Sequence, residues 1–132
     1  MTTAETLQRA LATESTVQLA VMFGSTTRET AGPASDVDVG VLGVASNRLP
    51  QLEASLSRAA GRPVDLIALE TAPPLLRFEV ARDGIVVLER TPHAWNDFRA
   101  RAMVDWWDWA PIARRFHRAA ADRLREQAGG SS

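Results

Sequence analysis

Two carboxylates, Asp36 and Asp38, stand two residues apart in a run that is otherwise apolar and ends at Leu42. Their alternation with three valines predicts a β-strand over 36–42, because successive side chains of a strand point to opposite faces. The valines then face a core, and both aspartates face a cleft. Like charges this close repel each other unless a cation lies between them, and paired carboxylate oxygens are ligands that Mg²⁺ prefers. The pattern therefore predicts a metal-binding pair on one face of a sheet.

The apolar stretch 17–23 predicts a central strand that is buried on both faces. A glycine and a serine follow it. Gly24 lets the backbone approach a ligand closely, and Ser25 adds a hydroxyl group. The polar residues that follow predict a helical turn, whose first N–H groups favour a phosphate. A phosphate site beside a metal pair indicates phosphoryl or nucleotidyl transfer.

The spacing of these groups carries a family resemblance. Gly24-Ser25, ten residues, and then Asp36-x-Asp38 resembles the signature of the DNA polymerase β-type nucleotidyltransferases. Within that superfamily the chain resembles the minimal nucleotidyltransferases (MNT), in particular the MntA-type antitoxins of HEPN/MNT toxin–antitoxin systems. The resemblance covers roughly residues 17–116. Glu29 departs from the pattern, since many members have glycine there.

The resemblance implies a catalytic site. A third carboxylate is expected on a later strand, and Asp65 lies where it would fall. With Asp36 and Asp38 it would hold Mg²⁺, and it would help to deprotonate the attacking hydroxyl. Three residues are implied to bind the β- and γ-phosphates of the co-substrate ATP: Gly24, Ser25 and Arg28.

The resemblance also implies a partner. The resembled antitoxins transfer AMP from ATP to a tyrosine of a HEPN ribonuclease toxin and so neutralise it. We therefore expect a Mg²⁺-dependent protein adenylyltransferase (AMPylator) with a helical HEPN-type toxin as partner, and a hetero-oligomer of the two is compatible with this expectation. The chain has no tyrosine, so a tyrosine acceptor must belong to another molecule. Two alternatives stay open: a small-molecule (antibiotic-type) nucleotidyltransferase, which normally needs extra chain to build an acceptor pocket, and a non-catalytic binding antitoxin.

Composition excludes several other kinds of site. All fifteen basic residues are arginine, which excludes a P-loop lysine and a Schiff-base lysine. The absence of cysteine excludes disulfides and thiolate metal sites and favours a cytoplasmic location. A net charge of −1 gives no general attraction to nucleic acid or to an acidic membrane, so we expect neither as a direct partner.

The order of the predicted elements indicates an α/β fold. We expect a small mixed sheet of about four strands, with helices mainly on one face and the metal site on the open face. Residues 1–128 are expected to form a single domain with a C-terminal helical region, 91–128, followed by a disordered tail, 129–132. The predicted helices are 3–13, 49–60 and one that starts at Pro74, and the predicted strands are 17–23, 36–42, 64–69 and, at an edge, 85–88.

The C-terminal helical region carries all four tryptophans. Trp106 and Trp107 are adjacent, about 100° apart around a helix, so one of them should protrude from the buried stripe. Pro111 predicts two helices or one sharp kink. The arginine and aromatic residues beyond it favour docking of a partner, and a solvated helix is the alternative.

Overall fold

The computed structural model describes residues 1–24 and 36–130, apart from some side chains after Ile112. In these residues the chain forms a four-stranded sheet in the order β3-β2-β1-β4, together with four α-helices. The elements in chain order are α1 (Thr3–Ala12), β1 (Leu19–Phe23), β2 (Val37–Leu42), a 3₁₀ turn (Ser46–Arg48), α2 (Leu49–Ala60), β3 (Val64–Ala68), α3 (Pro74–Asp83), β4 (Ile85–Glu89) and α4 (Ala94–Gly130). The predicted α/β class is confirmed.

The sheet is mixed, as predicted. β1 lies in its interior and pairs antiparallel with both β2 and β4, whereas β2 and β3 are parallel. All five residues of β1 are buried, which confirms the strand predicted from its two apolar faces. β4 lies at an edge, also as predicted.

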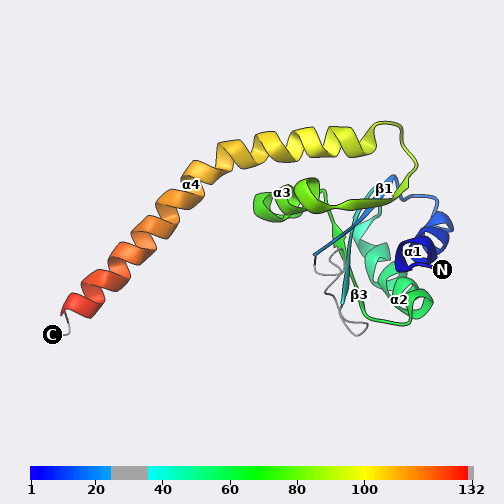
Figure 1. Cartoon of the computed structure of the whole chain (residues 1–132), viewed down its shortest axis with the longest axis horizontal. Coiled ribbons are helices and arrows are strands. Elements are labelled where there is room, and N and C mark those ends of the chain that lie inside the picture. The colour runs from blue at the N-terminus through cyan, green and yellow to red at the C-terminus, as the bar shows by residue number, and fades with distance from the viewer. Residues whose placement is uncertain (25–35, 131–132) are drawn as a thin grey trace.

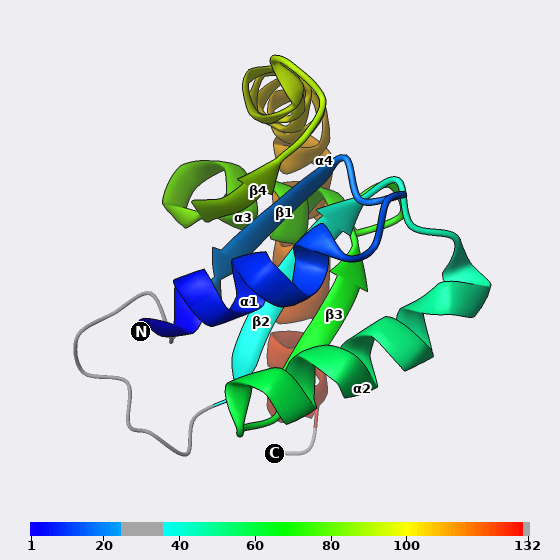
Figure 2. The ribbon, with the colours of Figure 1, turned by 90° about the vertical axis from the view of Figure 1, so that its right-hand side faces the viewer.

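Helices cover both faces of the sheet. Figure 2 shows α1 and α2 on one face and α3 with the first part of α4 on the other. The valines of β2 pack with Leu7, Leu11 and Leu56 in the first layer. Val21 and Phe23 of β1 point the other way, into a second cluster that contains residues of α3 and α4. The arrangement differs from the expected helices mainly on one face, because a strand that is apolar on both sides requires a cover on both sides.

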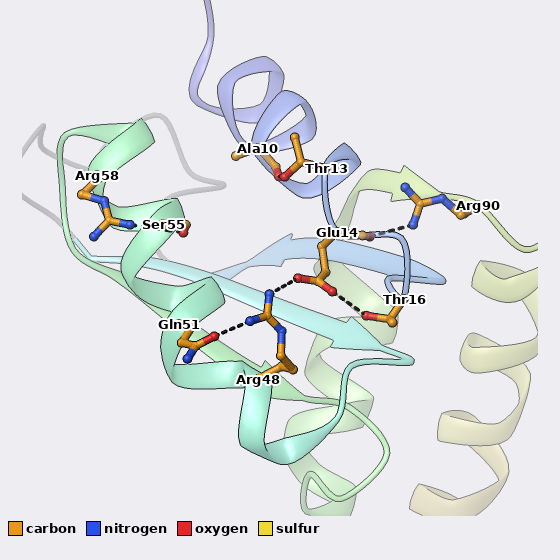
Figure 3. A network of polar contacts seen from close by, with 9 residues as sticks. All are labelled: Ala10, Thr13, Glu14, Thr16, Arg48, Gln51, Ser55, Arg58 and Arg90. Carbon is orange, nitrogen blue, oxygen red and sulfur yellow. Dashed lines mark hydrogen bonds and ion pairs between the residues drawn. The ribbon is translucent and has the colours of Figure 1, made fainter.

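The segment that follows α1 is held in place by a network of hydrogen bonds. The carboxylate of Glu14 accepts hydrogen bonds from the Nη2 of Arg48 at 2.6 Å and from the hydroxyl of Thr16 at 3.1 Å (Figure 3). Both bonds lower the pKa of Glu14, and the bond from Arg48 has the larger effect. Arg90, just after β4, donates to the backbone carbonyls of Glu14 at 2.9 Å and Val17 at 2.6 Å. The loop that leads into β1 is thus tied to the start of α2 and to the end of β4.

α4 is one helix that contains Pro111. Figure 1 shows it changing direction near its middle and extending away from the sheet. Proline removes one backbone donor and bends a helix. The sequence predicted either two helices or one sharp kink, and this shape agrees with the kink. The helix continues to Gly130 and so includes the first residues of the expected tail. None of the helices in the described residues combines the length and apolar character needed to cross a membrane.

Candidate active site

The strand register brings three predicted site residues together. Asp38 on β2 lies opposite Phe23, the last residue of β1, on one side and opposite Asp65 of β3 on the other. Gly24 directly follows Phe23 and therefore lies beside the same carboxylate. Asp36 comes just before β2 and is exposed. One end of the sheet thus carries Gly24 and the three predicted aspartates.

Gly24 is required by the geometry of the backbone and of its neighbour. Its φ angle is 81°, in the left-handed region that side chains other than glycine rarely adopt. A Cβ atom at this position would overlap the Oδ2 of Asp38. Because glycine has no side chain, its backbone can lie close to the carboxylate of Asp38.

The environment of Asp38 opposes its negative charge. Partial burial raises the pKa of its carboxyl group, and the negative charges of Asp65 and Asp36 raise it further. Asp65 is exposed although it lies on a strand whose neighbouring residues, Val64 and Leu66, are buried. The three carboxylates therefore form a negative potential at the end of the sheet, which a bound cation would relieve.

The donor set fits a hard divalent cation. Carboxylate oxygens are typical ligands of Mg²⁺, which proteins usually bind through one or two carboxylates together with substrate phosphates. The described residues contain no group of three acidic or histidine side chains that could by itself hold an ion. The aspartates therefore resemble a partial ligand set that a phosphate-bearing substrate would complete, and their role in binding Mg²⁺ stays a prediction.

Two predicted phosphate-binding residues, Ser25 and Arg28, lie outside the described residues, as does the helical turn expected after Gly24. Their place relative to Asp38 therefore stays a prediction. The described part of the site consists of the end of β1, the aspartates of β2 and β3, and the neighbouring helix α3.

A cavity of about 680 Å³ opens beside Asp38, between the sheet and α3. Its volume is in the range of a small-molecule site, which the sequence analysis did not expect in a chain of this length. The described residues that line it are Phe23, Gly24, Asp38, Ile67, Leu76, Glu79, Arg82, Asp83 and Ile85. The residues from α3 were missed by the sequence analysis, although Leu76, Glu79 and Asp83 recur at the spacing of one helix face.

Comparison with known proteins identifies both a family and a set of similar structures. The model of the family described as polymerase beta, nucleotidyltransferase matches residues 5–93. No curated protein sequence matches the chain.

Several solved structures have the same fold, among them the three that follow. A chain of a toxin–antitoxin crystal structure with AMP-PNP is 21% identical, with a TM-score of 0.73, and the match covers 92% of this chain and 98% of that one. A chain of the toxin–antitoxin MntA–HepT is 19% identical, with a TM-score of 0.67 and coverage of 93% and 97%. A chain of the tri-AMPylated Shewanella oneidensis HEPN toxin in complex with MNT antitoxin is 18% identical, with a TM-score of 0.64 and coverage of 92% and 98%.

Proposed function

The chain belongs to the polymerase β nucleotidyltransferase family, and from this premise we propose that it transfers AMP from ATP to a tyrosine hydroxyl of a helical HEPN-type toxin, which it thereby neutralises. The observation that carries the proposal is the position of Asp38, between Gly24 on one side and Asp65 on the other. The fold shared with MntA–HepT and with the AMPylated toxin complex supports the choice of partner and of transferred group.

The aspartates would hold Mg²⁺, which when bound neutralises phosphate charge and polarises the α-phosphate. Gly24 admits the phosphates close to the backbone, next to Asp38. The acceptor hydroxyl oxygen forms a bond to the α-phosphorus, and the bond from that phosphorus to the bridging oxygen of pyrophosphate breaks. Pyrophosphate leaves with the electron pair. Asp65 accepts the proton of the hydroxyl and passes it to solvent.

The acceptor enters from the side of Asp65. This carboxylate is exposed, so a hydroxyl carried by another protein reaches it without opening the fold. The cavity has Gly24 and Asp38 in its lining and is therefore assigned to the nucleotide. The small-molecule rival is favoured by the volume of that cavity, but ATP would occupy it in either case, so the acceptor would have to reach Asp65 from outside.

α4 supplies a surface for the helical partner. Trp107 is 72% exposed and Ile112 is 48% exposed. Arg114, Arg115 and Arg118 follow and are exposed too. Tryptophan and arginine are enriched at the energetically dominant positions of protein interfaces. Figure 1 shows that this part of α4 extends beyond the sheet, where a partner has free access to it.

The test is intact-mass spectrometry of the chain mixed with a helical HEPN-type protein, ATP and Mg²⁺. One or more AMP units should appear on the partner, and they should vanish when its candidate tyrosine is changed to phenylalanine. Omission of the chain is the control. Nucleotide found only on a small molecule, with a bound but unmodified partner, would support the antibiotic-type rival instead.

A further inference from the structure

One face of α3 forms a wall of the cavity beside Asp38. Leu76 lies one turn before Glu79, and Asp83 lies one turn after it, so the three side chains share a face. The other walls are largely apolar, with Ile67 from β3 and Ile85 from β4. The cavity therefore has one charged side on α3, apolar side chains on its other walls, and Asp38 and Gly24 in its lining.

Two of the charged groups on this wall are already paired. The Nε and Nη2 of Arg82 donate to the Oδ2 of Asp83 at 2.9 and 2.8 Å. The guanidinium group of Arg82 also lies over the ring of Phe78, 5.6 Å from its centroid. Arg82 lines the cavity, but its charge is already paired with Asp83 on its own helix.

Glu79 is in a different situation. It lines the cavity and is exposed, and its charge, after that of Asp83, raises the pKa of Arg82, but within the described part of the chain it accepts no hydrogen bond. An ionised carboxylate has only acceptor oxygens, so it requires a ligand that carries donors. Phosphate groups carry negative charge and no such donors at neutral pH, so the acidic wall disfavours them. The phosphates of a nucleotide consequently lie at Gly24 and Asp38, and its nucleoside lies against α3.

We propose that Glu79 determines specificity for a ribonucleotide, because its carboxylate accepts hydrogen bonds from the ribose hydroxyls. The inference rests on the proposed function, since it assumes that the cavity holds the nucleotide. The two neighbouring hydroxyls of ribose match the two oxygens of a carboxylate, and hydrogen bonds to charged acceptors are the stronger ones. The base then lies against the apolar walls at Leu76 and Ile85.

The test measures binding of ATP, 2′-deoxy-ATP and 3′-deoxy-ATP to the full chain with Mg²⁺ by calorimetry, without a partner protein. The wild type should bind ATP roughly tenfold more tightly than at least one deoxynucleotide. Glu79→Ala should remove most of this preference by weakening ATP and leaving the deoxynucleotide nearly unchanged. Glu79→Gln, which keeps the size of the side chain, should also reduce the preference.

Glu5→Ala is the matched control, since Glu5 is an exposed helical glutamate on α1, on the opposite face of the sheet. It should keep the wild-type preference. Equal affinity of the wild type for all three nucleotides, or a preference that survives Glu79→Ala, would overturn the inference while leaving nucleotide binding intact. If no nucleotide binds to the wild type, the proposed function fails together with the inference.

Discussion

At the scale of single residues, Asp38 is the group whose charge the fold opposes most clearly. Burial and two neighbouring carboxylates raise its pKa above the ordinary value of 3.8. The folded chain therefore holds this proton more tightly than the unfolded chain does. As the pH rises through the interval between the two pKa values, the contribution of Asp38 to the free energy of unfolding decreases. At neutral pH the ionised group opposes folding, and a bound cation offsets this effect.

Replacement of the pair Asp36→Asn and Asp38→Asn should abolish AMP transfer, because the oxygens that bind the cation lose their charge. The melting temperature in metal-free buffer should stay unchanged or rise, since the repulsion is removed. The gain should shrink when the pH is lowered through the pKa of Asp38, where the wild type is protonated too. Thermal denaturation and mass spectrometry measure the two effects. Retained transfer together with a large loss of melting temperature would contradict the assignment.

At the scale of elements, α3 is attached to α4 through side chains. The rings of Phe78 and Trp106 are stacked, with centroids 5.2 Å apart, and Trp109 lies 5.6 Å from Trp106. Arg77 of α3 forms an ion pair with Asp105 of α4 at 2.8 Å, and the side chain of Arg77 is largely buried. Other residues of the same helix, Glu79 among them, form the wall of the cavity. The position of that wall therefore depends on its packing against α4.

Trp106→Ala should destabilise the chain by about 2–3 kcal/mol, because it removes the ring that stacks on Phe78. It should also weaken ATP binding, since the wall that carries Glu79 loses its support. Trp107→Ala is the matched control: that side chain is 72% exposed, and its loss should change stability little. Urea denaturation and calorimetry measure both quantities. Equal nucleotide affinity in the two variants would show that the wall is positioned by other contacts.

At the scale of the whole molecule, the proposed nucleotide site and the projecting part of α4 are separate. Ala110 is the last buried residue among the described side chains of α4, and those described after it are exposed. The sheet and its two clusters of core residues therefore do not depend on the described side chains beyond this point. This projecting part of α4 is where we propose that the partner docks.

Truncation after Ala110 should weaken binding to the helical partner by at least tenfold and leave ATP affinity nearly unchanged. The reason is that it removes exposed arginine and apolar side chains that are far along α4 from the cavity wall. Binding to immobilised partner and calorimetry with ATP measure the two effects. A truncated chain that still binds its partner at full strength would place the docking surface elsewhere.

The local elements could be predicted from the sequence because their signals depend on near neighbours. The alternation around Asp38 marks a strand with a polar face, and Pro74 marks the first turn of a helix. The adjacent Trp106 and Trp107 predicted one protruding ring, which is confirmed by the exposure of Trp107. The family was also predicted, from the spacing of Gly24-Ser25 and the aspartates.

Three features depended on the tertiary structure. The parallel register of β2 and β3 places Asp65 beside Asp38, and no local pattern contains this register. The second feature is the cover of the other face of the sheet by α3 and α4, which arises from the need to bury the second face of β1. The third is the cavity wall at Glu79, which follows from the position of α3. Each is a contact between residues distant in the chain. Local periodicity predicts which face of an element is apolar, but only packing of the whole chain decides what covers it.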